Sequence, residues 1–324
     1  MPIDPQIEIL LRQLAAEGGP APESRTVAEN RAAGRAFAAL AGAAEPVAEV
    51  LDTTVPAGDR EIPIRIYRPV TEPDAGPLPV TLYFHGGGWV FGDLDTQDHI
   101  ARTVADRSGT IVVSVDYRLA PEHRFPAATD DAYAALTWVA DNAAGFGGDG
   151  ERIAVFGESA GGNLAATLAQ EALRRGGPCI TLQVLAYPAL DRFDDSPSMY
   201  EYTTGPILSR SYLEWFWAVY LGSPDQGGRF AVPCRRDQGD HLRLSSAHRG
   251  RYSSTGRRVA WPREAAARAR TARLPASSIS RLVKPVIELC EHDDIVPWHL
   301  TPAAGDRCFA GRGKRARTTV RAKN

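Results

Sequence analysis

The five-residue segment GESAG (157–161) contains the residue type best suited to nucleophilic chemistry, a serine close to two glycines. The apolar segment that ends in this motif (152–158) predicts a strand, and the segment that follows (160–175) has the spacing of a helix. A serine at such a strand–turn–helix junction presents its hydroxyl above the edge of the sheet. The helix then places its positive N-terminal end beside a developing negative charge. We therefore expect Ser159 to be the nucleophile of an acyl-transfer reaction.

A second chemical feature is the run HGGG (85–88), which follows an apolar segment typical of a buried strand. The tetrahedral intermediate of acyl transfer carries a negative oxygen that needs N–H donors. Glycines let main-chain amides approach such an oxygen because they have no Cβ. We expect the N–H groups of Gly86, Gly87 and Ala160 to form this oxyanion hole. For His85 we favour a structural hydrogen-bonding role over that of the general base, because it precedes the loop.

Strands and helices alternate through much of the chain, and this alternation predicts how the two motifs are positioned. Apolar strands separated by helices indicate an α/β fold with a mostly parallel central sheet flanked by helices. Residues 46–68 alternate on both sides of the turn AGD, which predicts a hairpin with Ile62, Ile64 and Ile66 on one face. The other predicted strands are 78–84, 110–117, 152–158 and 180–187, and the predicted helices are 99–109, 130–143 and 160–175.

The same patterns divide the chain into three parts. Residues 1–45 are Ala-rich with helical spacing and predict an N-terminal helical cap segment. Residues 46–228 predict the core, with a cap insertion near 193–222. Aromatic side chains crowd that insertion, and they fit either a core helix or a cap over an apolar substrate pocket. Residues 229–324 form an atypical Arg-rich C-terminal region.

Three motifs resemble, in order and spacing, the bacterial hormone-sensitive-lipase family of lipolytic enzymes, also called the GDXG family: HGGGWVFGDLDT (85–96), DYRLAPEHRFPAATDD (116–131) and GESAGGNLA (157–165). The resemblance covers about residues 45–225. It implies an α/β-hydrolase core with a helical cap and a Ser–Asp–His triad that hydrolyses short-chain acyl esters. It implies no cofactor and no metal. Some relatives are acetyl-hydrolases, so N-acetyl groups are an additional expected substrate.

The resemblance also gives roles to the middle motif. It implies that polar side chains of this motif support the active-site loops by hydrogen bonds. We favour a salt-bridged structural role over a catalytic one for these residues, which are Asp116, Tyr117, Arg118 and Glu122.

The acid and the base of the expected triad are harder to place. The segment 284–297 reads as a strand that ends in acids, and Asp293 fits the family's acid motif best. Asp294 is its nearest competitor, and both could equally be ordinary loop acids. In the family the histidine lies well after the acid, whereas His299 and His292 are close to Asp293. The general-base histidine is therefore left unassigned.

The C-terminal region 229–324 is rich in Arg, and its residues 229–281 have little hydrophobic periodicity, although the net charge of the chain is only -2. GC-rich coding DNA translated out of frame gives peptides rich in Arg, Ala, Gly and Pro. We hypothesise that the recorded reading frame slips near residue 229, or that the C-terminal third is otherwise aberrant and disordered in part. The rival interpretation is a basic arm that binds nucleic acid, but this region has no aromatic residues interleaved with its basic ones and no recognised nucleic-acid-binding motif. We therefore expect no nucleic-acid partner.

These patterns predict a serine carboxylesterase or acetyl-hydrolase that forms an acyl-enzyme on Ser159. The alternative is a catalytically impaired or ligand-binding α/β-hydrolase homologue that lacks the general-base histidine. The N-terminus does not read as a signal peptide and no apolar run is long enough to span a membrane. We expect a cytoplasmic protein without membrane insertion, with free thiols. Its expected partners are a small acyl ester and, from the resemblance, a second copy of the chain.

Overall fold

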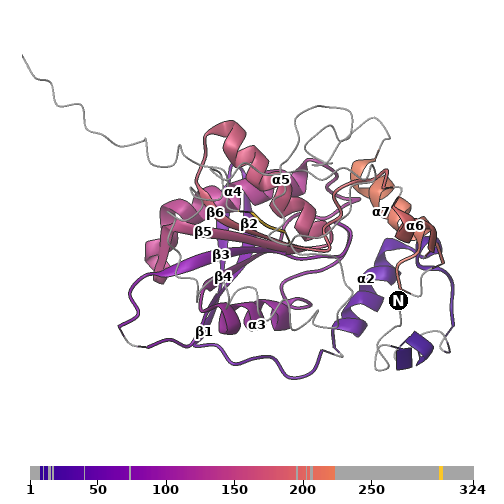
Figure 1. The fold of residues 1–324 in the computed structure, drawn as a ribbon, viewed down its shortest axis with the longest axis horizontal. Helices are drawn as coiled ribbons and strands as arrows, with labels where there is room; N and C mark the ends of the chain where they lie inside the picture. The colour runs from indigo at the N-terminus through magenta and orange to yellow at the C-terminus, as the bar shows by residue number, and fades with distance from the viewer. Residues whose placement is uncertain are drawn as a thin grey trace, which may run out of the picture.

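The computed structural model describes residues 8–9, 11–13, 16, 18–39, 41–72, 74–194, 196–201, 203–204, 207–222 and the backbone of 299–301. These residues form a seven-stranded sheet in the order β1-β2-β4-β3-β5-β6-β7 (Figure 1). The four strands β4, β3, β5 and β6 are parallel, whereas β1, β2 and β7 pair antiparallel. The strands are β1 Glu49–Ala57, β2 Arg60–Arg68, β3 Leu78–Phe84, β4 Ile111–Val115, β5 Gly148–Glu158, β6 Ile180–Ala186 and β7 His299–Thr301.

The central strands are apolar along nearly their whole length because both faces of the sheet are covered. All five residues of β4 are buried, as are the last five of β3. In the outer hairpin of β1 and β2, buried and more exposed residues alternate along β2 instead. Its inward-facing residues Ile62, Ile64 and Ile66 are at most 2% exposed. Gly58, with φ +72, allows the tight turn between the two strands. The predicted α/β fold and the predicted hairpin are confirmed.

Helices form a layer on each face of the sheet (Figure 1). One face carries α3, whose buried residues pack with Tyr67, Tyr83 and Phe156. The opposite face carries α4 and α5 over the larger apolar cluster. A third group, α2, α6 and α7, lies at one end of the sheet. The helices are η1 Pro22–Ser24, α2 Val27–Ala38, α3 Asp98–Ser108, α4 Ala127–Asn142, η2 Ala143–Phe146, α5 Ala160–Arg175, α6 Pro197–Glu201 and α7 Arg210–Leu221.

The parallel strands β3, β4, β5 and β6 all end at the same edge of the sheet, which brings their following segments together. The glycine loop 85–88 follows β3, the motif that begins at Asp116 follows β4, and Ser159 follows β5. In open α/β sheets, ligands bind outside the carboxyl ends of the strands. The topology therefore assembles the three sequence motifs at one edge.

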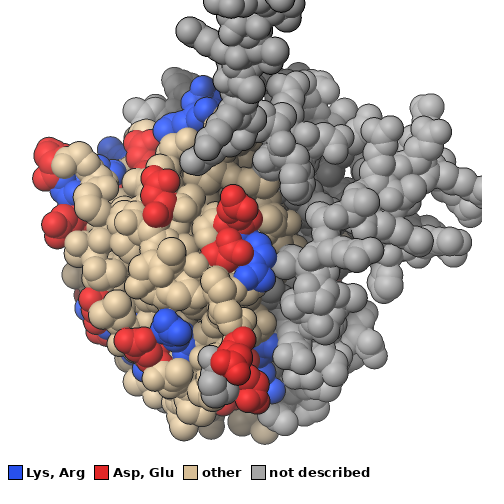
Figure 2. Space-filling view, turned by 90° about the vertical axis from the view of Figure 1, so that its left-hand side faces the viewer, with Lys and Arg blue, Asp and Glu red and all other residues tan. Residues whose placement is uncertain are grey.

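The surface opposite α2, α6 and α7 carries acidic and basic side chains intermingled, without a broad patch of one sign on the face shown in Figure 2. No helix within the described ranges is both long and apolar enough to cross a bilayer. Cys179, just before β6, is disulfide-bonded. The expectation of free thiols is therefore wrong for this residue.

Candidate active site

Ser159 lies at a sharp turn between β5 and α5. Its backbone has φ 54 and ψ −117, a conformation rarely adopted by residues other than glycine. The turn is held against β6, because Ser159 N–H donates to Ala186 O at 2.9 Å and Ser159 O accepts from Ala189 N–H at 3.0 Å. The serine is half-buried, and its hydroxyl makes no hydrogen bond to any described residue. The arrangement leaves the hydroxyl available for nucleophilic attack.

Close packing explains the glycines that flank the nucleophile. A Cβ at Gly157 would lie 2.2 Å from Gly161 O, and a Cβ at Gly161 would lie 1.8 Å from Phe84 O. Such distances are far below van der Waals contact, so only glycine fits at either position. The same contact places the end of β3, and with it the glycine loop, directly against the start of α5.

The glycine loop uses its three amides differently. Gly86 N–H donates to the Glu158 carboxylate at 2.7 Å, so it is not free to bind an oxyanion. The expectation that Gly86 belongs to the oxyanion hole is therefore contradicted: the carboxylate beside the nucleophile occupies this donor. The N–H groups of Gly87, Gly88 and Ala160 make no hydrogen bond to any described residue. Gly88 N–H is a further candidate donor, which the sequence interpretation did not name.

His85 is a structural residue in this arrangement. It is fully buried, and desolvation lowers its pKa to about 4, so the ring is neutral at physiological pH. Its ring stacks on Tyr117 with centroids 4.3 Å apart, and the Tyr117 hydroxyl donates to His85 O at 2.7 Å. A Cβ at Gly92 would collide with the ring, which fixes the loop on its other side. These contacts support the structural role expected for His85.

Two arginines hold the segments that surround the loop. Arg118 pairs with the fully buried carboxylate of Asp131 at 2.9 Å, and Arg60 on β2 also pairs with it. Hydrogen bonds from both arginines lower the pKa of Asp131 despite desolvation, which acts in the opposite direction and is the largest single effect. Asp131 thus stays ionised. The salt-bridged role expected for Arg118 agrees with this geometry.

Arg31 of α2 reaches the backbone beside the glycine loop. Its Nε donates to Val90 O at 2.8 Å and its Nη2 to Ala120 O at 3.1 Å. The guanidinium also makes two hydrogen bonds to Glu122, at 2.8 and 2.7 Å. The N-terminal helix is therefore tied directly to the loop. The sequence interpretation missed Arg31, because nothing in the pattern of α2 distinguishes this arginine from others.

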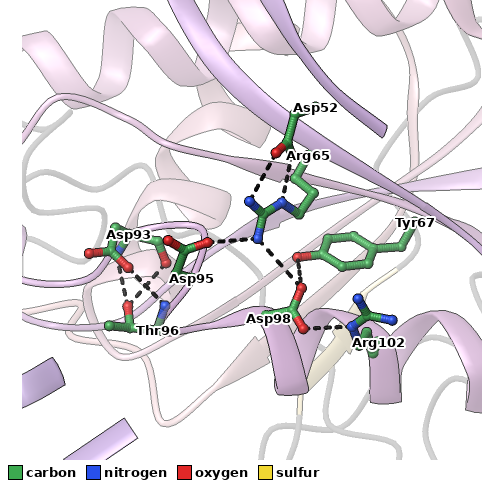
Figure 3. Close-up of polar contacts among 8 residues, drawn as sticks. All are labelled: Asp52, Arg65, Tyr67, Asp93, Asp95, Thr96, Asp98 and Arg102. Carbon is green, nitrogen blue, oxygen red and sulfur yellow. Dashed lines mark hydrogen bonds and ion pairs between the residues drawn. The ribbon is translucent and has the colours of Figure 1, made fainter. Parts of the chain in front are cut away.

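A charged network supports the segment that follows the glycine loop (Figure 3). Arg65 on β2 donates to Asp52 at 2.6 and 3.0 Å and to Asp95 at 2.9 Å. Asp98, at the start of α3, accepts from the Tyr67 hydroxyl at 2.9 Å and lies 3.5 Å from Arg65. This network joins β1, β2 and α3 to the loop. It is a scaffold, because none of its members is at the serine turn.

Asp93 and Asp116 are two further acidic residues near this charged network. Asp93 and Thr96 exchange hydrogen bonds of 2.8 and 2.9 Å, which fold the residues between them into a turn. Desolvation, with Asp93 and Asp95 as neighbouring negative charges, raises the pKa of Asp116 to about 6. Asp116 therefore carries a penalty in its ionised form that Asp131 avoids by pairing.

The aromatic helix α7 both packs in the core and covers the loop. Trp89 stacks on Tyr220 with ring centroids 4.3 Å apart, which anchors the helix to the glycine loop. Phe216 lies so close to Gly88 that a Cβ there would be 1.9 Å from its ring. Phe91 closes the same cluster, 5.2 Å from Phe216. The core interpretation of the aromatic stripe is confirmed, and the same helix also contacts the glycine loop, whereas a cap over a substrate pocket stays a prediction.

The predicted acid and the histidines considered for the base cannot be placed. Asp293, Asp294 and His292 lie outside the described residues. The backbone of His299 begins β7, paired with Leu185 of β6. The general base thus remains unassigned among the described residues.

A protein-family profile described as alpha/beta hydrolase fold matches residues 81–248, more than half of the chain. The chain belongs to the α/β-hydrolase family. This α/β hydrolase is 48% identical over 176 residues to the carboxylesterase NlhH of Mycobacterium tuberculosis H37Rv, with 54% of each protein covered. It is 39% identical over 189 residues to the ethyl acetate hydrolase of Pseudomonas putida, covering 58% of the chain and 59% of that enzyme.

Two further comparisons show similarity to a mammalian deacetylase and to an archaeal esterase. It is 43% identical over 179 residues to the arylacetamide deacetylase of Bos taurus, covering 53% of the chain and 44% of that enzyme. The structure of a hyperthermophilic esterase from Pyrobaculum calidifontis superposes with a TM-score of 0.67 at 42% identity, covering 72% of the chain and 75% of that structure. The chain spans about half the length of the curated relatives it matches. The predicted family resemblance is confirmed.

Proposed function

We propose that this α/β hydrolase is a serine carboxylesterase that cleaves short-chain acyl esters through an acyl-enzyme on Ser159. The strained, glycine-packed turn that holds the Ser159 hydroxyl at the carboxyl edge of the sheet carries the proposal. The relatives described above are named a carboxylesterase, an ethyl acetate hydrolase, an arylacetamide deacetylase and an esterase. No specific observation favours the ligand-binding alternative.

The reaction would proceed in two halves. Ser159 Oγ loses its proton to a base and attacks the acyl carbonyl, the alcohol departs, and water then releases the acyl group. The oxyanion of each tetrahedral intermediate would be bound by the N–H groups of Gly87, Gly88 and Ala160, which are free of hydrogen bonds to described residues. The positive N-terminal end of α5 adds to this stabilisation. The reaction requires neither a metal nor a cofactor.

For the rest of the triad we keep Asp293 as the proposed acid and leave the base open. Without a base that accepts its proton, a serine hydroxyl is a weak nucleophile at neutral pH. Ala substitutions at His299 and His292 would separate the two candidates, because only loss of the true base abolishes turnover. The reading-frame hypothesis for residues 229–324 also stays a proposal, and translation of the gene in its other two frames tests it.

The central prediction concerns the nucleophile. Replacing Ser159 with Ala should lower kcat for a chromogenic acetyl or butanoyl ester by about 10⁵-fold or more, because the acyl-enzyme can no longer form. The control is Ser108→Ala, on the distant helix α3, which should leave kcat unchanged. Equal turnover by wild type and Ser159→Ala would contradict the proposal. A matched acetanilide substrate then shows whether N-acetyl groups are also cleaved.

Partners and location are part of the proposal. We propose that the substrate is a small acyl ester and that the protein has no nucleic-acid partner. We also propose that it forms a homodimer, and light scattering would measure the mass of that assembly. We also keep the cytoplasm as the proposed compartment. Disulfides are rare there, so the bonded Cys179 argues against it, and cell fractionation decides the question.

A further inference from the structure

Glu158 lies between the nucleophile turn and the glycine loop, in contact with both. It is the last residue of β5, directly before Ser159, and it is 6% exposed. Its Oε1 accepts hydrogen bonds from Gly86 N–H at 2.7 Å and from the Tyr83 hydroxyl at 2.9 Å. The residue before the nucleophile therefore binds, through its buried carboxylate, the loop that is proposed to bind the oxyanion.

The contact between Glu158 and the loop is tight. A Cβ at Gly86 would lie 3.2 Å from Glu158 O and 3.3 Å from its side chain. The loop then turns through Gly87, with φ +110, and Gly88, with φ +62. Because each peptide group is planar, fixing the first amide of so short a turn restricts the directions of the next two.

We propose that Glu158 is a positioning residue: its carboxylate holds Gly86 N–H, so that the amides of Gly87 and Gly88 face the oxyanion of the reaction. The role rests on the proposed esterase function, and it acts through the loop rather than on the reacting atoms. An ionised acceptor makes a hydrogen bond roughly twice as strong as a neutral one. The charge of Glu158 should therefore determine how firmly the loop is held.

The surroundings of Glu158 place its titration near neutral pH. Burial raises its pKa to about 7, although the bonds from Gly86 and Tyr83 lower it. Its second oxygen, Oε2, is buried without a hydrogen bond to any described residue, so it can carry the proton. His85, the nearby imidazole, is neutral because burial lowers its pKa. The hydroxyls of Tyr83 and Tyr117 interact electrostatically with Glu158, and that of Tyr187 interacts with Tyr83.

A direct test observes the loop without relying on turnover. In the full chain labelled with ¹⁵N-glycine, the Gly86 amide proton should lie downfield at high pH and move upfield as the pH falls through about 7. In Glu158→Gln, which keeps a neutral acceptor, this movement should vanish. In Tyr83→Phe its midpoint should rise, because the carboxylate loses a donor. A Gly86 signal without titration in wild type, or unchanged in Glu158→Gln, would overturn the proposal.

Kinetics with a short-chain ester test the consequence for catalysis. Glu158→Ala should lower kcat by about 10- to 100-fold with KM nearly unchanged, because the oxyanion forms only in the transition state. Glu158→Gln should recover part of this loss. Glu151→Gln, the same change at an exposed site on β5, is the matched control and should behave as wild type. A loss confined to KM, or none beyond the control, would overturn the positioning role.

The two proposals fail in different ways. If the wild-type protein hydrolyses no ester, the esterase function fails, and the Gly86 signal still decides whether Glu158 holds the loop. If hydrolysis occurs while the loop is indifferent to Glu158, only the positioning role fails. Should Glu158→Ala not fold, Glu158→Gln and Tyr83→Phe carry the test alone, because each removes only a charge or a hydroxyl.

Discussion

Single glycines decide whether the chain can form the nucleophile turn. The start of α5 approaches the end of β3 so closely that Phe84 O lies where the Cβ of any other residue at 161 would be. The atoms that would have to move are backbone atoms of a central strand, which cannot shift without breaking sheet hydrogen bonds. The requirement is therefore one of steric fit rather than of flexibility.

Gly161→Ala should lower the free energy of unfolding by about 1–3 kcal/mol, as overpacking in a rigid site does. It should also abolish most of the proposed esterase activity, because the nucleophile turn at Ser159 and the glycine loop would be pushed apart. Gly145→Ala is the matched control, since a Cβ there meets nothing within 4 Å. Urea unfolding and ester hydrolysis measure both effects. If the two variants are equally stable and active, the contact is not what the geometry indicates.

The sequence predicted the serine turn well because its signal is local: a strand, a glycine-flanked serine and a helix follow one another. It included Gly86 among the oxyanion donors because the contact that occupies this amide is not local. Glu158 lies 72 residues from Gly86, and no pattern near the glycines shows which N–H is already occupied. Three glycines in a row are chemically equivalent in sequence and differ only in the folded chain.

At the scale of elements, Arg31 joins the N-terminal helix α2 to the segments beside the glycine loop. Arg31 donates to two backbone oxygens that flank the loop and pairs with Glu122. These contacts span 59 to 91 residues of sequence, so helical spacing could predict α2 but not its attachment. The position of α7 over Gly88 could not be predicted from the sequence either, because a stripe of aromatic residues fits a core helix as well as a cap.

Arg31→Ala should loosen α2 and lower the free energy of unfolding by about 1–2 kcal/mol, the usual range for lost hydrogen bonds to a charged group at a partly exposed site. Arg31→Lys should recover little, because an ammonium group cannot reproduce the fork of donors. Arg35→Ala, exposed on the same helix, is the control. Denaturant unfolding would measure the loss of stability in each variant, and kcat/KM would measure the accompanying change in ester hydrolysis. Equal effects at 31 and 35 would refute a special role for Arg31.

At the scale of the whole molecule, acidic side chains near the catalytic edge affect stability in opposite directions. The pKa of Asp131 is lowered, so its contribution to stability is present above the unfolded pKa and is lost as the pH falls through the folded value. The pKa of Asp116 is raised to about 6, so the folded state loses stability as the pH rises from about 4 to 6.

Asp116→Asn should therefore stabilise the protein at pH 8 by about 1–2 kcal/mol, after a reduction for partial exposure, and have little effect at pH 4.5. The gain reflects removal of a charge that burial and two neighbouring carboxylates disfavour. Asp141→Asn, an exposed site on α4, serves as control and should show no such pH dependence. Urea unfolding at the two pH values measures the difference. A gain of equal size at both would rule out titration of Asp116 as its cause.

The backbone at Ser159 has a consequence for how this protein could be engineered. A left-handed φ at a residue with a Cβ costs on the order of 1–3 kcal/mol, which glycine would not incur. A library of variants screened for heat resistance alone would thus tend to collect glycine at 159. Such variants lack the Ser159 hydroxyl, and a stability screen would not detect that loss. Thermal selection of this fold has to be paired with a turnover screen from the first round.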